Sequence, residues 1–118
     1  MIKGVHSILI STDDINKLTP FYRDVIGLNA AMEGAEFAVF ATGSGSQLAL
    51  GVHSEVKGRS KEPNRIMVDL EVDNCQAEYD RLRAKGVEFT REPTEDEGFI
   101  VATLLDPDGN QLQLFQVG

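Results

Sequence analysis

The chain repeats one order of predicted secondary structure, and this repeat constrains its fold more than any other feature. Each half begins with an apolar, β-branched strand, continues with an amphipathic helix, and ends in further strands separated by turns rich in Gly, Pro or Asp. The first helix is predicted at 15–26 after Asp13-Asp14, and the second follows Asn74 and ends at Gly86. The predicted strands lie at 3–11, 36–41, 47–52, 65–72, 87–90, 99–105 and 111–117.

This order predicts an α+β fold made of two βαβββ modules, at about 3–52 and 65–117, within a single domain spanning residues 1–118. The polar stretch 53–64 between the modules is predicted to be a linker or mobile loop. The helices are expected to pack on the outer faces of two curved mixed sheets. The other faces of the sheets are then expected to curve together and enclose a cleft.

The charge and the apolar pattern limit the partners of the chain. Asp and Glu total 19 against 11 Lys and Arg, a net charge of −8, so the chain would repel a phosphate backbone and nucleic-acid binding is not expected. No apolar run approaches the roughly 20 residues of a membrane-spanning helix, and the first residues lack a cleavable signal pattern. We expect a cytoplasmic protein with no membrane partner. The acidic run at 92–97 and the basic run at 57–65 are predicted to lie in solvated loops.

Three motifs in a fixed order carry a family resemblance. They are FYRDVIGL after the first strand, LRAKGVEF on the second helix, and DPDGNQLQLFQ at the end. Together they make nearly the whole chain similar to the vicinal oxygen chelate superfamily, which includes glyoxalase I, extradiol dioxygenases and bleomycin-resistance binding proteins. The resemblance implies the paired-module fold and a homodimer. It leaves the activity open, because the superfamily ranges from metalloenzymes to proteins that only sequester a drug.

The same resemblance implies four metal-ligand positions, one on the first and one on the last strand of each module. They fall on His6, Ala49, Met67 and Gln113. Only His6 is a good ligand, since a methyl group donates nothing, a thioether is soft, and an amide carries no charge. The sequence therefore predicts no metal cofactor. A shifted metal site built from His6, Asp69 and Gln113 stays an alternative.

Two hypotheses for the function follow. The first is a small-molecule binding or sequestering protein without catalysis, whose ligand is cationic or aromatic because carboxylates and aromatic residues alternate on the predicted inner strands. Its predicted binding residues are His6, Ile8, Val39, Ala49, Met67, Asp69, Glu71, Gln113 and Phe115. The alternative is a metal-dependent lyase, isomerase or dioxygenase with a degenerate site centred on His6.

Overall fold

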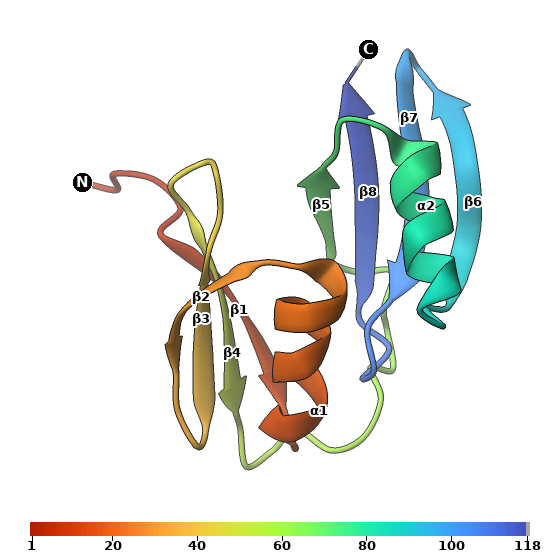
Figure 1. Cartoon of the computed structure of the whole chain (residues 1–118). Coiled ribbons are helices and arrows are strands. Elements are labelled where there is room, and N and C mark those ends of the chain that lie inside the picture. Colours follow the sequence, from red (N-terminus) through yellow and green to blue (C-terminus); the bar gives the residue numbers. More distant parts are fainter. Residues whose placement is uncertain (118) are drawn as a thin grey trace. The chain divides into compact units, whose positions relative to one another are not determined.

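The computed structural model describes residues 1–117, so Gly118 of the predicted domain lies outside the described residues. The chain divides into two compact units, Met1–Gly58 and a second that begins at Arg59. Each unit is a four-stranded mixed sheet with helix packed on one face, as Figure 1 shows for each unit in turn. The predicted α+β class and the two modules are confirmed. None of the helices in residues 1–117 is long and apolar enough to cross a membrane.

The first unit contains four strands in the order β1-β4-β3-β2, with β1 parallel to β4 and the other pairs antiparallel. Its elements are β1 (Ser7–Thr12), α1 (Ile15–Pro20), the π-helix η1 (Phe21–Ile26), β2 (Asn29–Glu33), β3 (Phe37–Ala41) and β4 (Gln47–Val52).

A change of helix type at Pro20 divides the helix that the sequence predicts as one segment. Asp14 caps the start of α1 by accepting a hydrogen bond from Asn16 N at 3.0 Å. Pro20 has no backbone N–H to donate, and the chain continues as a π-helical turn from Phe21. The turn ends at Gly27, whose φ of 92° lies in the left-handed region that favours glycine.

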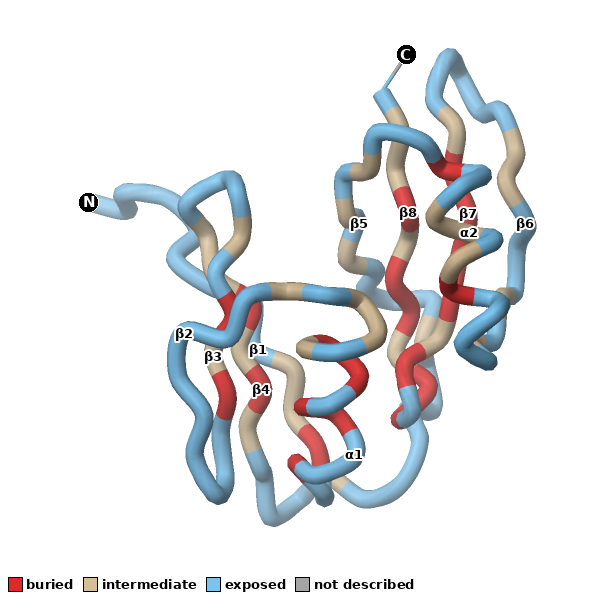
Figure 2. Tube along the Cα trace, in the orientation of Figure 1, coloured by how far each residue is buried: buried red, intermediate tan, exposed pale blue. Residues whose placement is uncertain are grey.

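The core of the first unit lies between this helical segment and the sheet. Leu18 and Tyr22 are fully buried, and the ring of Tyr22 lies 6.3 Å from that of Phe40 on β3. Leu48 and Leu50 of β4 complete the buried face. Figure 2 shows buried positions alternating with intermediate or exposed ones along β3 and β4. The alternation leaves the other face of the sheet outside this core.

The second unit has the same plan, with strand order β5-β8-β7-β6 and β5 parallel to β8. Its elements are β5 (Met67–Glu71), α2 (Cys75–Ala84), β6 (Phe89–Asp96), β7 (Phe99–Leu105) and β8 (Gln111–Val117). Asn74 caps α2 as predicted, since its side chain accepts a hydrogen bond from Ala77 N at 3.0 Å. Leu82 of α2 is buried in a core that includes Leu104 and Leu114 of the sheet.

Three strand predictions need correction, while those at 99–105 and 111–117 are confirmed. The first strand begins at Ser7 rather than residue 3, because its parallel partner β4 begins only at Gln47. Strand β2 is missing from the predicted strands, because every residue of this edge strand is exposed and its sequence shows no apolar alternation. The short strand predicted at 87–90 is β6, so most of the acidic run at 92–97 lies in an edge strand and not in a loop. Charged side chains are common on edge strands, where they discourage pairing with another chain.

The predicted linker at 53–64 is held on both sides of the unit boundary. Gly58 N donates to Asp13 Oδ2 at 2.9 Å within the first unit. Ser60 N donates to the carbonyl oxygen of Asp108 at 2.7 Å within the second, and the Arg59 guanidinium donates to the carbonyl of Pro107 at 3.4 Å. These bonds divide the predicted linker between the two units. The boundary therefore falls at the single peptide bond between Gly58 and Arg59.

Candidate functional site

Five of the predicted binding residues share one face of the second sheet, the face away from α2. On β5, Val68 and Leu70 are half-buried toward the helix, while Met67, Asp69 and Glu71 alternate with them and are exposed. The parallel register pairs Asp69 with Gln113 and Glu71 with Phe115. We call this surface, together with Phe99 described below, the acidic face. It consists of Met67, Asp69, Glu71, Gln113, Phe115 and Phe99.

A hydrogen bond joins the two strands at the centre of the acidic face. Gln113 Nε2 donates to Asp69 Oδ1 at 3.1 Å. The bond orients both side chains and leaves Asp69 Oδ2 and Gln113 Oε1 as hydrogen-bond acceptors. Arg65, which precedes β5, pairs with Glu62, whose Oε2 atom lies 3.0 Å from Arg65 Nε. Within residues 1–117 no Lys or Arg is paired with Asp69 or Glu71. The face therefore offers negative charge and acceptors.

Two aromatic rings lie beside these carboxylates. Phe99 of β7 and Phe115 of β8 have centroids 4.7 Å apart and an interplanar angle of 34°. Phe99 is 37% exposed, so the pair presents ring surface to solvent. Phe115 is also the register neighbour of Glu71, which places a carboxylate next to the rings. Phe99 is not among the predicted binding residues, although it lies two residues before Val101 and therefore has the same strand parity.

In the first unit, the strand register places the predicted binding residues on two different faces of the sheet. Val39 pairs with Ala49, and Leu9 pairs with Ala49 on the other side, so these residues share the face away from α1. Ile8 pairs with buried Leu48 and belongs to the α1 side of the sheet. Ile8 and Ala49 therefore lie on opposite faces of the first sheet. The role of Ile8 in binding stays a prediction.

His6 lies just before β1 and is exposed, and its carbonyl oxygen accepts a hydrogen bond from Gln47 N at 3.0 Å. By strand alternation, Ser7 rather than His6 has the parity of Leu9 and Ala49. The resemblance places His6 on the first strand, but β1 begins one residue later at Ser7. His6 therefore does not share the face of Leu9 and Ala49. Its role in binding stays a prediction.

The side chains at the expected metal-ligand positions do not fit a divalent cation. Ala49 offers a methyl group, Met67 a thioether, and Gln113 an amide whose NH2 group is bonded to Asp69. Within either unit of residues 1–117, no three His, Cys, Asp or Glu side chains gather into a group that could hold a metal ion. No chemical step through a metal can be derived from this donor set.

The remaining His and Cys side chains have local structural roles. His53 Nδ1 accepts a hydrogen bond from Glu55 N at 3.1 Å in the turn after β4. Cys75 is fully buried in the first turn of α2, and this burial raises the pKa of its thiol. Burial and a raised pKa both disfavour the thiolate, which is the nucleophilic form of cysteine.

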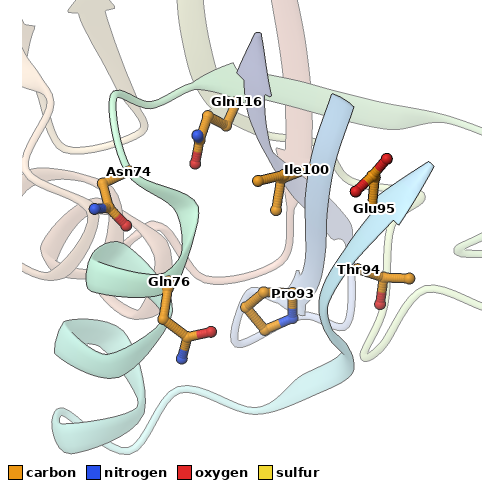
Figure 3. Close-up of a pocket in the computed structure, with 7 residues that line it drawn as sticks. All are labelled: Asn74, Gln76, Pro93, Thr94, Glu95, Ile100 and Gln116. Carbon is orange, nitrogen blue, oxygen red and sulfur yellow. The ribbon is translucent and has the colours of Figure 1, made fainter. Parts of the chain in front are cut away.

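A pocket lies on the α2 side of the second sheet, the side away from the acidic face. Figure 3 shows the pocket between the start of α2, next to Asn74, and the strands β6, β7 and β8. Its volume is about 430 Å³, and none of the predicted site residues lines it. The lining residues are Asn74, Gln76, Pro93, Thr94, Glu95, Ile100 and Gln116.

Comparisons with known proteins agree with this architecture. Residues 4–114 match the family described as the Glyoxalase/Bleomycin resistance protein/Dioxygenase superfamily. The chain is 23% identical over 114 residues to the uncharacterized protein YetH of Bacillus subtilis (strain 168), covering 93% of this chain and 95% of that protein. A superfamily member from Sphaerobacter thermophilus DSM 20745 has a TM-score of 0.77 and 25% identity, over 98% of both chains. A glyoxalase/dioxygenase from Nostoc punctiforme has a TM-score of 0.80 and 16% identity, over 98% of this chain and 92% of that chain.

Proposed function

Since the chain belongs to the Glyoxalase/Bleomycin resistance protein/Dioxygenase superfamily, we propose that it is a small-molecule binding protein that holds its ligand on the acidic face without the metal of its catalytic relatives. Dimer formation and a cytoplasmic location stay predictions from the sequence. The observation that carries the proposal is the chemistry of the acidic face, where two carboxylates without a Lys or Arg partner in residues 1–117 lie beside a partly exposed aromatic pair.

The acceptors on this face specify the polar part of the ligand. Asp69 Oδ2, Gln113 Oε1 and the Glu71 carboxylate accept hydrogen bonds, so a complementary ligand carries a cationic or hydrogen-bond-donating group. The net charge of −8 raises the local concentration of cations around the chain. A carboxylate that already accepts an amide hydrogen bond is also oriented before the ligand arrives, which reduces the entropy lost on binding.

The aromatic pair specifies the rest of the ligand. Phe99 and Phe115 offer an apolar surface for a planar or aromatic group, and the face of a ring attracts a nearby cation. Because Glu71 is the register neighbour of Phe115, one ammonium group can contact a ring face and a carboxylate together. An aromatic ammonium compound is therefore the ligand class that best matches the acidic face.

A titration followed by ¹H–¹⁵N NMR tests the proposal. The probes are benzyltrimethylammonium, tetramethylammonium, which lacks the ring, and benzyl alcohol, which lacks the charge. We expect saturable shifts at 69–71, 99 and 113–115 with the first probe and weaker binding of the other two. Asp69→Asn and Glu71→Gln should each weaken binding about two- to fivefold, while Glu88→Gln, an exposed carboxylate away from this face, should not.

Metal content, measured on untagged protein after exposure to zinc, nickel, manganese and ferrous iron, separates this proposal from the metalloenzyme hypothesis. Binding of benzyltrimethylammonium that is unchanged by chelator supports the acidic face as a metal-free site. A stoichiometric metal that His6→Ala removes would overturn the proposal. So would the absence of any saturable shift on the acidic face.

A further inference from the structure

The pocket beside α2 is separate from the acidic face, because its lining residues lie on the opposite side of the same sheet. Ile100 and Gln116 are register partners on β7 and β8, and they have the parity of the buried residues that face α2. The volume of about 430 Å³ falls within the roughly 300–1,000 Å³ that is typical of ligand pockets. Nothing in the proposed function uses this pocket.

Two amide side chains on the α2 side of the pocket are held in fixed orientations. Asn74 Oδ1 accepts from Ala77 N at 3.0 Å, and Gln116 Oε1 accepts from Cys75 N at 2.8 Å. Each carbonyl oxygen is therefore bonded to the first turn of α2, and each NH2 group is left as a donor in a residue that lines the pocket. These two side chains cap the backbone N–H groups of Ala77 and Cys75, and the donors that the site offers to a ligand are their amide NH2 groups.

The opposite side of the pocket carries negative charge. Figure 3 shows the Glu95 carboxylate across the pocket from Asn74, with Ile100 between them. Within residues 1–117 no Lys or Arg forms an ion pair with Glu95. Arg91, on the same strand, pairs with Asp96 instead, with its Nη2 atom 3.7 Å from Asp96 Oδ2. The pocket therefore has amide donors on one side and a carboxylate acceptor on the other.

The region between these polar groups is apolar. Ile100 and Pro93 are half-buried and line the pocket between α2 and β6. A ligand that matches the pocket needs an anionic or carbonyl group toward α2, an ammonium group toward Glu95, and a small apolar body that contacts Ile100 and Pro93. An anion alone would be repelled by Glu95, and a cation alone would leave both amide NH2 groups without an acceptor.

We propose that this pocket is a second binding site, specific for a small zwitterion of the α-amino acid class with an apolar side chain. Its carboxylate accepts hydrogen bonds from the Asn74 and Gln116 amides, and its ammonium group pairs with Glu95. The apolar side chain packs on Ile100 and Pro93. The site is independent of the ligand proposed for the acidic face.

The test uses L-leucine and two derivatives that each lose one charge, N-acetyl-L-leucine and L-leucinamide. Each is titrated into ¹⁵N-labelled protein and followed by ¹H–¹⁵N NMR. We expect saturable shifts with L-leucine at 74–76, 94–95, 100 and 116. Both derivatives should bind more weakly, because each loses the partner of one side of the pocket.

Matched variants separate a specific site from general surface binding. Glu95→Gln should weaken L-leucine binding about two- to fivefold. The same substitution should not weaken binding of N-acetyl-L-leucine, because this anion has no ammonium group for Glu95 to pair with and is repelled by its charge. Glu88→Gln removes the same charge elsewhere on the second unit and should have no effect, as should Asp69→Asn on the acidic face. Equal binding of L-leucine and its derivatives would overturn the proposal. The absence of saturable shifts in the pocket up to the solubility limit of L-leucine would overturn it as well.

Discussion

Gln113 and Asp69 lie opposite each other on the parallel strands β8 and β5, and Gln113 Nε2 donates to Asp69 Oδ1 at 3.1 Å. The family resemblance implies a metal-ligand position at Gln113, where a carboxylate would carry the negative charge that the amide lacks. A carboxylate at that position would face Asp69 across the register with a like charge. The amide instead makes the pair attractive, and this supports the proposed role of the acidic face as an acceptor surface for an organic cation.

The first prediction concerns the stability that this hydrogen bond provides. In a double-mutant cycle of Asp69→Ala and Gln113→Ala, we expect a coupling free energy of about 0.5–1 kcal/mol in favour of the pair. The value is modest because water competes with this solvent-exposed hydrogen bond. Urea denaturation of the four proteins measures it. Additive effects of the two substitutions would show that the bond does not contribute to folding.

The second prediction separates the two rings of the acidic face. Phe99 is the first residue of β7 and its side chain is 37% exposed, whereas Phe115 is half-buried beside Glu71. Phe99→Leu should therefore weaken binding of benzyltrimethylammonium while changing the free energy of unfolding little, by about 0.5 kcal/mol or less. Phe115→Leu should lower both the affinity for benzyltrimethylammonium and the free energy of unfolding, because the half-buried ring of Phe115 also packs within the sheet. Isothermal calorimetry and urea denaturation provide the two readouts, and equal effects of the two variants would contradict this division.

The fold could be predicted from the sequence because its signals are local and repeated. Asn74 is a strong cap, Gly27 and Gly86 permit the left-handed exits, β7 is a nearly continuous apolar run, and β8 begins with alternating Gln and Leu residues. The edge strands were harder to locate. Strands β2 and β6 bury little side-chain surface, so their pairing depends on backbone hydrogen bonds that leave no pattern in the sequence.

The sequence pattern predicted which candidate residues share a sheet face in the second unit but not in the first, and their role in binding stays a prediction. Asp69 and Glu71 interrupt an apolar strand, and that contrast fixed their face correctly. In β1 the run Ser7–Ser11 has apolar residues at three consecutive positions, so the alternation has no clear phase. The resemblance then placed His6 one residue out of register, and only pairing with β4 resolves it.

The third prediction is that Cys75 is unreactive in the folded protein. Its side chain is fully buried, and burial raises the pKa of its thiol. We expect a thiol reagent such as DTNB to label native protein slowly at pH 8 and to label protein in denaturing urea rapidly. The labelling rate should increase with urea in parallel with global unfolding. Rapid labelling without denaturant would show that the first turn of α2 opens locally.

The fourth prediction follows from the contact between Asp13 and the boundary of the units. The hydrogen bond from Gly58 N to Asp13 Oδ2 lowers the pKa of this carboxyl below its usual value of 3.8, and Lys17 at 3.4 Å lowers it further. A depressed pKa means that the ionised carboxylate is bound more favourably in the folded state. The stabilisation is therefore complete above the unfolded pKa, near pH 4, and is lost as the pH falls through the lower folded pKa.

Asp13→Asn should consequently be less stable than the parent chain at pH 6, and the difference in melting temperature should shrink as the pH falls below about 4. Differential scanning calorimetry between pH 2.5 and 7 measures both curves. Glu88→Gln is the control, because it removes one charge from a side chain that makes no hydrogen bond or ion pair in residues 1–117. A difference between Asp13→Asn and the parent chain that stays constant down to pH 2.5 would mean that the carboxylate charge does not stabilise the turn at Gly58. The effect of Asp13 would then arise from hydrogen-bond geometry alone.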